Sequence, residues 1–235
     1  MNRLDNAHRL AYLTTMGITA WLPRNVVQTE RNAQEPVLVI HESPIPLSTA
    51  TEEGWAKLEA EVAVCSRCGL CKTRNNTVFG TGNRQASWLL IGEGPGQHED
   101  EQGKQFVGHA GQLLTEMIRA MGLVRDEVFI TNVIKCRQPN NRDPHQEEVT
   151  ACHSFLQRQV DLIKPSIILA VGRVAAQTLL DTDAPLSRLR GKVHYFGQTP
   201  LIVVYHPAYL LRSLLEKRKA WQDLLFARKV ARDLL

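Results

Sequence analysis

Short apolar runs that alternate with amphipathic segments constrain the fold of this chain more than any other feature. Three of these runs, 88–91, 128–130 and 201–205, are rich in branched and aromatic residues. That composition is typical of strands buried on both faces of a parallel sheet. Strands that alternate with helices favour such a sheet with helices on both sides. We therefore predict an α/β fold, a three-layer α/β/α sandwich around a central, mainly parallel, four-stranded sheet.

The spacing of apolar residues and the helix-start signals place the elements along the chain. Residues 110–121 carry apolar side chains at helical spacing, and 146–163 follows Pro144 and opens with acidic residues that favour a helix N-terminus. The expected strands are 87–91, 127–133, 166–171 and 201–205, and the expected helices are 52–64, 110–121, 146–163, 173–180 and 216–234.

Length and composition limit the class of protein. The chain has 235 residues, of which 43% are hydrophobic and 22% charged, enough for one sizeable core plus an appendage. A net charge of +4 permits a polyanionic partner without requiring one. No apolar run reaches the roughly 18 residues of a membrane span, and the first residues lack the apolar stretch of a signal peptide. We expect a cytoplasmic protein that does not enter membranes.

The chain divides into three parts by composition. Residues 1–24 predict a short helical interaction peptide, and residues 25–50, rich in proline and polar side chains, predict a linker. The compact domain is expected to occupy residues 51–235.

Five cysteines form the most specific chemical pattern. Cys65, Cys68 and Cys71 are two residues apart, and Cys136 and Cys152 lie far downstream. This spacing lets thiolates converge on one metal centre and suits zinc or an iron–sulfur cluster equally. Without an export signal, clustered thiols are more often ligands than disulfides. The spacing leaves open which four cysteines bind, and a site that uses both downstream cysteines would fasten the N-terminal segment to the core.

Three motifs follow expected strands. They are Gly92-Glu93-Gly94-Pro95-Gly96, Thr131-Asn132-Val133 and His206-Pro207-Ala208-Tyr209-Leu210. Because ligands bind at the carboxyl ends of strands in open α/β sheets, we expect the motifs to share one crevice. Glycines let the backbone approach a ligand closely, but the spacing matches neither a P-loop nor G-x-G-x-x-G.

Several side chains near these motifs have two interpretations. Phe106, in a polar and glycine-rich setting, either stacks on a base or closes the core. Asn132 either pairs with a donor and an acceptor of a flat heterocycle or caps a turn. His206 precedes a proline, which favours an extended conformation at a strand end. The acidic stretch 99–101 either borders the site or forms a solvated loop.

Ordered motifs run from Cys65 to the C-terminus. They are Cys65-x-x-Cys68, Val78-Phe79-Gly80, Gly92–Gly96, Glu99-Asp100, Phe106-Val107-Gly108, Thr131–Arg137, Asn141-Arg142, Leu189-Arg190-Gly191 and His206–Arg212. Together these motifs resemble the family-4 iron–sulfur uracil-DNA glycosylases. The resemblance implies an α/β/α sandwich with a [4Fe–4S] cluster. It also implies a monofunctional enzyme that hydrolyses the N-glycosidic bond of uracil in DNA and leaves an abasic site for base excision repair.

The resemblance also assigns roles to particular residues. Phe106 would stack on the flipped uracil, Asn132 would bind its pyrimidine edge, and His206 would donate to uracil O2 as negative charge develops. Glu99 would exclude the 5-methyl group of thymine, and Gly92 and Gly94 would shape the pocket. The implied cluster ligands are Cys65, Cys68, Cys136 and Cys152, which leaves Cys71 over, and the implied DNA wedge is Leu210, with Arg212 beside it.

The identity of the group that handles the attacking water stays open. Related uracil glycosylases place an aspartate at the position of Gly94. Here Glu93 or Glu99 would substitute, or the water would need only positioning. Another relative crosslinks itself to the abasic product through a histidine-containing insertion after the Phe-Val segment. This chain lacks the insertion, so we expect turnover, with His109 as a candidate for a covalent adduct.

Two alternatives use the same residues differently. The first is a catalytically weak damaged-DNA-binding or replisome-tethered protein on the same fold, and the second is a zinc-stabilised nucleotide-binding domain. Residues 9–24, with Gly17-Ile18-Thr19-x-Trp21, resemble the N-terminal peptide of the psi subunit of the bacterial clamp loader. That resemblance implies a tail that tethers repair to the replication machinery. We also expect the protein to be monomeric, bacterial and nucleoid-associated. Otherwise this segment packs on its own domain with Trp21 buried.

Overall fold

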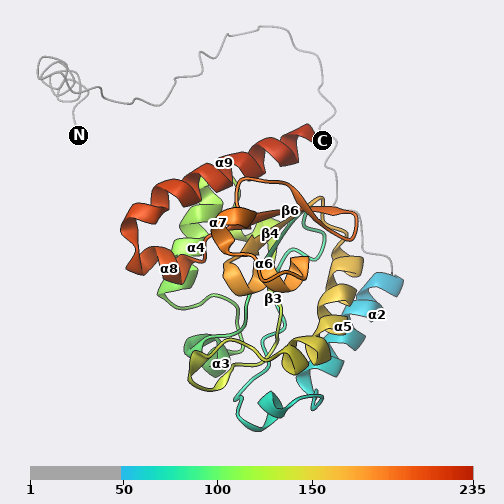
Figure 1. Cartoon of the computed structure of the whole chain (residues 1–235). Helices are drawn as coiled ribbons and strands as arrows, with labels where there is room; N and C mark the ends of the chain where they lie inside the picture. The colour runs from blue at the N-terminus through green and yellow to red at the C-terminus, as the bar shows by residue number, and fades with distance from the viewer. Residues whose placement is uncertain (1–48, 235) are drawn as a thin grey trace, which may run out of the picture. The chain divides into compact units, whose positions relative to one another are not determined.

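Four parallel strands form the centre of the structure, a computed structural model that describes residues 49–234 (Figure 1). They are β2 (Trp88–Gly92), β3 (Val128–Asn132), β4 (Ile167–Val171) and β6 (Thr199–Val204). β2 pairs with both β3 and β4, and β4 pairs with β6, in parallel each time. The four strands predicted from apolar runs are therefore confirmed.

Two short antiparallel strands at the sheet edges were not predicted. β1 (Thr81–Gly82) pairs with β3, and β5 (His194–Phe196) pairs with β6, which gives six strands in the order β1-β3-β2-β4-β6-β5. Neither edge strand is buried. They have no apolar run for that reason, and their ladder partners rather than their composition define them.

Helices cover both faces of the sheet, as predicted. Alternate residues of β2 point to opposite faces, with Leu89 and Ile91 in one core cluster and Leu90 in the other. The first cluster includes α2 (Thr49–Ala63), α5 (Gln146–Ile163), α6 (Arg173–Leu180) and α7 (Leu186–Leu189). The second includes α4 (His109–Ala120), α8 (Pro207–Arg212) and α9 (Lys217–Asp233).

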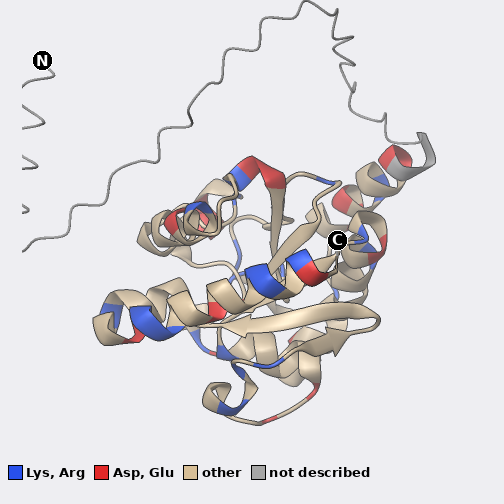
Figure 2. Ribbon diagram, turned by 90° about the horizontal axis from the view of Figure 1, so that it is seen from above, with Lys and Arg blue, Asp and Glu red and all other residues tan. Residues whose placement is uncertain are grey.

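Shorter helices connect these layers. α3 spans Gln97–Gln102, and 3-10 turns span Gly69–Lys72, Arg125–Glu127, Pro139–Asn141 and Leu214–Glu216. Lys and Arg recur along α9 with Asp residues between them (Figure 2).

Two ion pairs join elements that are distant in the sequence. Arg158 on α5 donates two hydrogen bonds to the carboxylate of Glu61 on α2, the longer of them 3.1 Å. This pair holds α2 on the core. Arg190 donates to both carboxylate oxygens of Asp223 on α9, at 2.6 and 2.9 Å. Both members of this second pair are mostly buried, so the pair fixes α9 against the segment before β5.

The predicted interaction peptide, residues 1–24, lies outside the described residues, as does nearly all of the predicted linker. The docking of residues 9–24 on a clamp loader therefore stays a prediction. Across residues 49–234, none of the helices combines the length and the apolar character that crossing a bilayer requires.

Candidate active site

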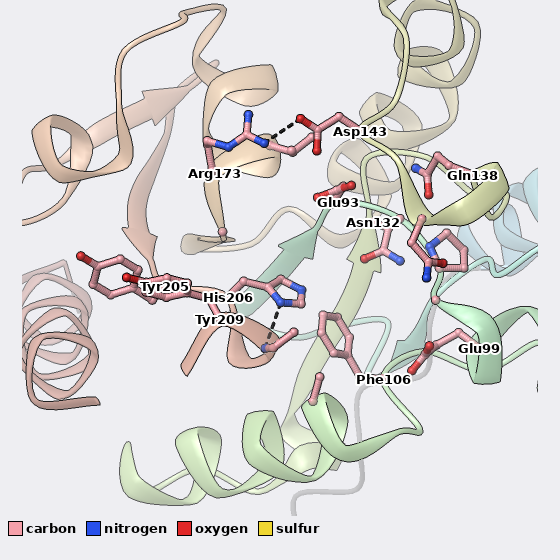
Figure 3. A pocket seen from close by; sticks show the side chains of 18 of the residues that line it. Glu93, Glu99, Phe106, Asn132, Gln138, Asp143, Arg173, Tyr205, His206 and Tyr209 are labelled. Atoms are coloured by element: carbon pink, nitrogen blue, oxygen red, sulfur yellow. Dashed lines mark hydrogen bonds and ion pairs between the residues drawn. The ribbon is translucent and has the colours of Figure 1, made fainter. Parts of the chain in front are cut away.

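The three motifs predicted to share a crevice do so. A cavity of about 680 Å³ lies at the carboxyl ends of the parallel strands. Glu93, Asn132 and His206, which follow or end three different strands, all line it (Figure 3). A volume of this size is typical of a small-molecule site and accommodates one nucleobase with its sugar.

Phe106 is held in the cavity wall by its own backbone. Its φ of 50° lies in the left-handed region, and Arg125 Nη2 donates to the carbonyls of Gln105 and Phe106 at 2.8 and 3.3 Å. Gly111 makes this possible, since a β-carbon there would come 1.7 Å from the Phe106 carbonyl oxygen. The phenyl ring lies 5.8 Å from the His206 ring, tilted by 33°. The protein thus presents a fixed aromatic surface inside the cavity.

Asn132 presents an acceptor without a partner. Its Nδ2 donates to Gln105 Oε1 at 2.9 Å, while its Oδ1 is buried and has no hydrogen-bond partner among the described residues. A β-carbon on Gly92 would lie 2.5 Å from that oxygen, so only glycine allows the close approach. Asn132 therefore does not cap a turn. An orphaned buried acceptor beside a cavity points to a ligand that donates a hydrogen bond.

His206 is neutral and offers one N–H to the cavity. Its Nδ1 accepts from the backbone N–H of Ala208 at 3.1 Å, which leaves the proton on Nε2. Burial, together with the nearby Arg212, lowers the pKa of His206 to about 4, while Glu99 opposes the shift. A neutral imidazole that donates through Nε2 stabilises an oxygen on which negative charge develops.

Glu93 titrates near neutral pH. Burial raises the pKa of its carboxyl to about 7, and Asp143 adds to the rise while Arg173 opposes it. Asp143 and Arg173 form an ion pair of 2.6 Å at the cavity edge. A carboxylate with a pKa close to the working pH has the properties of a general base.

Glu99 lines the same cavity and holds the loop that carries Phe106. Its Oε1 accepts from the backbone N–H groups of Val107 and Gly108 at 2.8 and 3.3 Å. The following residue, Asp100, is buried and accepts from the backbone N–H of Asn75 at 3.0 and 3.1 Å. The solvated-loop interpretation is therefore wrong for Asp100, which lies in α3, whereas the neighbouring Glu101 is exposed.

The chain is similar in sequence to known proteins. The family model described as the uracil DNA glycosylase superfamily matches residues 79–225. A type-4 uracil-DNA glycosylase of Archaeoglobus fulgidus is 46% identical over 159 residues, which cover 64% of this chain and 80% of the relative. The chain belongs to the type-4 uracil-DNA glycosylases. Type-4 uracil-DNA glycosylases of Sulfurisphaera tokodaii and Thermotoga maritima are 43% and 42% identical, over 68% and 69% of this chain and 80% and 85% of their own lengths.

The wedge predicted by analogy with this family needs correction. Leu210 is 1% exposed and packs in the core cluster shared by α4 and α9, so it is not available to enter a base stack in this structure. It lies in the helix α8, whose next residue, Leu211, is 43% exposed. Arg212, the other residue of the predicted wedge, is exposed and lines the cavity.

Two tyrosines form an aromatic wall of the cavity in this type-4 glycosylase, and they were not predicted from the sequence. Tyr205 and Tyr209 line the cavity with their rings stacked, 5.2 Å apart and 26° from parallel. The Arg190 guanidinium lies 4.2 Å from the centre of the Tyr205 ring and is fixed by its pair with Asp223. The Leu189-Arg190-Gly191 motif was the available signal, although it gives no role for its arginine.

Four of the five cysteines, Cys65, Cys68, Cys136 and Cys152, lie in or against the core cluster that includes α2 and α5. Burial raises the pKa of the Cys68, Cys136 and Cys152 thiols, that of Cys136 to about 11, and neighbouring thiols add to each rise. Cys65 contributes to the rise at Cys68 and Cys152, and Cys71 contributes to the rise at Cys68. Within residues 49–234 no three His, Cys, Asp or Glu side chains are close enough to hold a single metal ion.

Lys135 connects this region to the cavity. It is buried between Asn132 and Cys136, and its Nζ donates to the Asn132 carbonyl at 2.7 Å. The same Nζ donates to Thr131 Oγ1 and Gln159 Oε1, each at 2.7 Å. The Lys135 backbone also hydrogen-bonds the Cys152 thiol, so Lys135 connects the base of the cavity to the cysteine region.

Proposed function

We propose that this protein removes uracil from DNA by flipping it out of the helix and hydrolysing its N-glycosidic bond. One observation carries the proposal. A buried acceptor without a partner (Asn132 Oδ1), a neutral histidine N–H donor and a fixed phenyl ring all border one cavity. Uracil offers N3–H to the acceptor, O2 to the donor and its face to the ring. The names of the type-4 relatives support the same activity.

Binding begins with extrusion of the base, which costs a few kcal/mol because stacking and pairing are lost. We assign the phosphate contacts to exposed cations near the cavity, namely Arg212 at the end of α8 and Lys217 and Arg218 at the start of α9. The apolar side chains next to them, Leu211, Leu214 and Leu215, are exposed. They replace Leu210 as the candidates for filling the space that the base leaves.

The reaction then follows from the charges in the cavity. The bond between C1′ and N1 breaks, its electron pair passes to uracil, and His206 Nε2–H donates to O2 as that oxygen becomes negative. Water adds to C1′ and gives its proton to Glu93. The proton returns from Glu93 to the uracil anion, which leaves uracil and an abasic sugar.

Selectivity for uracil rests on Asn132 and Glu99. Asn132 Oδ1 pairs with a donor at N3, which cytosine lacks, so cytosine would leave a buried acceptor unpaired. The Glu99 carboxylate is fixed by two backbone N–H groups and cannot easily move aside for the 5-methyl group of thymine.

We also propose that Cys65, Cys68, Cys136 and Cys152 hold a [4Fe–4S] cluster. The donor set fits, since Cys136 interacts electrostatically with Cys68 and Cys152, and Cys152 also with Cys65, whereas no three metal-ligating side chains of residues 49–234 have the close spacing of a single-ion site. The sulfur ligands of a four-iron cluster lie further apart than those around one ion. When bound, the cluster would tie the segment after α2 to β3 and α5, which is a structural task.

The test is strand cleavage. An oligonucleotide with one uracil is incubated with excess protein and then heated in alkali, which breaks the strand at an abasic site. We expect cleavage by the wild type, and a roughly 10²- to 10³-fold slower single turnover for His206→Ala and Asn132→Ala. Binding of the oligonucleotide without cleavage would favour the damaged-DNA-binding alternative instead.

The N-terminal tail needs a separate experiment. We propose that residues 9–24 dock on the clamp loader with Trp21 as the anchor. A pull-down with purified clamp loader should lose most of the bound protein when Trp21→Ala replaces the wild type. Equal capture of both would contradict the docking and leave the glycosylase activity untouched.

A further inference from the structure

We propose that Gln138 holds the attacking water in this glycosylase. Gln138 follows β3, directly before the 3-10 turn Pro139–Asn141, and lines the cavity. Its side chain is 3% exposed, and its Nε2 is buried without a hydrogen-bond partner in the described part of the chain. The inference rests on the proposed function, because it names one more residue for the same reaction.

Gln138 occupies space that a side chain at position 94 would otherwise fill. A β-carbon on Gly94 would lie 2.5 Å from Gln138 Nε2 and 3.1 Å from its Oε1, with Ile134 Cγ1 at 2.9 Å as the other neighbour. The amide therefore rests directly on the Gly94 backbone, and only glycine leaves room for it. Since Glu93 precedes Gly94, this contact brings the free N–H donor to the part of the cavity that holds the candidate base (Figure 3).

An unpartnered buried donor implies a missing ligand. Leaving such a group unsatisfied costs about 1–3 kcal/mol, so folded proteins retain few of them. Among residues 49–234, four buried side-chain atoms lack a hydrogen-bond partner, and one of these, Glu216 Oε2, is ion-paired with Lys219. Two of them border the cavity, the acceptor Asn132 Oδ1 and the donor Gln138 Nε2. The acceptor takes uracil N3–H, which leaves the donor for the second reactant.

Water satisfies the remaining donor in a way that suits the reaction. Its oxygen has two lone pairs, and one accepts the Gln138 N–H while the other points to C1′. A proton of the same water lies toward the Glu93 carboxylate and passes to it as the bond between oxygen and C1′ forms. Gln138 thus fixes the direction of attack, whereas Glu93 takes the proton.

The test replaces the donor but keeps the packing. Gln138→Met has a similar length and fills the space over Gly94 without an N–H. We expect single-turnover excision to slow roughly 10- to 100-fold, with unchanged KM, unchanged inhibition by free uracil and an unchanged thermal midpoint. Gln157→Met on α5, away from the cavity, is the matched control and should keep the wild-type rate.

A second measurement distinguishes a loss of water orientation from a general loss of activity in the variant. In buffers with added methanol, either water or methanol attacks C1′, and the two products are counted. We expect Gln138→Met to change the ratio of methyl glycoside to free sugar, since the site no longer selects water. A rate within twofold of the wild type, or a slower rate with an unchanged ratio, would overturn the proposal. A wild-type protein that releases no uracil would instead overturn the proposed function.

The contact with Gly94 gives an independent check. Gly94→Ala should displace the Gln138 amide and slow excision to a similar degree. In a Gln138→Ala background, Gly94→Ala should cost less than in the wild type, because the amide it displaces is already gone and only the contact with Ile134 Cγ1 remains. Fully additive effects of the two substitutions would contradict the geometry on which the proposal rests.

Discussion

Gly172 and His206 are in such close contact that a β-carbon on Gly172 would lie 2.9 Å from His206 Cβ. Gly172 follows β4 with a φ of 99°, and its N–H donates to the carbonyl of Val204 at 2.9 Å. The ends of two neighbouring strands therefore fix the position of the histidine, and the backbone of one strand forms the seat for the side chain of the other.

This contact predicts that Gly172→Ala inactivates the enzyme. The new methyl group would displace His206, and a shift of about 1 Å in a reacting group slows catalysis roughly 100-fold. Gly197→Ala is the matched control, because Gly197 also has a positive φ, 59°, but nothing lies near its β-carbon position. Both variants should lose about 1–2 kcal/mol of unfolding free energy. Equal activity of the two would show that the His206 contact does not matter.

The pKa of Glu93 predicts the pH profile of excision. Because burial raises this pKa to about 7, the carboxylate that accepts the proton is lost as the pH falls below neutrality. The single-turnover rate should then fall about tenfold per pH unit below about pH 7 and level off above it. Because the pKa of His206 is about 4, its titration should cause no further change in the single-turnover rate between about pH 5 and pH 8. Glu93→Gln should be slow and independent of pH over this range, and a flat profile for the wild type would contradict the assignment.

The Glu93 carboxylate should also lower the free energy of unfolding when it is ionised. Its pKa is about 7 in the folded protein and ordinarily 4.5, so folding favours the protonated form. The protonated Glu93 carboxyl contributes its full stabilisation below about pH 4.5, and this contribution is lost as the pH rises through about 7. Glu93→Gln should therefore gain about 1 kcal/mol at about pH 8, after allowance for solvent screening, and raise Tm by about 2–4 °C. Thermal denaturation at about pH 8 and pH 5 checks this, and an equal gain at both would contradict it.

Gln105 should control discrimination between uracil and cytosine. Its Oε1 accepts from Asn132 Nδ2, and without that bond the asparagine amide can turn over. We expect Gln105→Met to lower kcat/KM for uracil about tenfold, since one buried hydrogen bond contributes about 1 kcal/mol. The preference over cytosine should also fall, as measured on mixed oligonucleotides. Gln112→Met, on the exposed side of α4, should leave both quantities unchanged.

The cysteine assignment predicts which thiols hold iron. Purified wild-type protein should contain about four iron atoms per chain and absorb near roughly 400 nm. Cys136→Ala should lose both, together with stability, because the thiol joins β3 to the segment after α2. Cys71→Ala should keep the iron and the absorption. Stoichiometric zinc without absorption would instead support a zinc site.

The sequence was most informative about elements with strong end signals or long apolar runs. The helices α5 and α6 begin and end at the residues predicted for them, one after Pro144 and an acidic first turn, the other after Gly172. α3 was missed because its six residues are polar and its buried residue is an aspartate. A helix of six residues such as α8 shows too little periodicity to reveal that Leu210 faces inward.

The residues of the candidate site were also predicted only in part. Glu93, Asn132 and His206 follow strand ends, where the rules of parallel sheets bring distant residues together. Gln138, Gln105 and Arg173 were not predicted. Each lies outside the motifs that gave the site its expected residues and reaches the cavity only through contacts between remote segments. No local pattern of residues encodes such contacts.

The backbone of Phe106 has a consequence for how this enzyme binds an extruded base. A left-handed conformation at a non-glycine residue costs about 1 kcal/mol or more, and here folding has already met that cost through Arg125, before any DNA arrives. Each extruded base therefore encounters a finished surface. Binding of the base then carries no cost for ordering that surface, because the aromatic face is already in place.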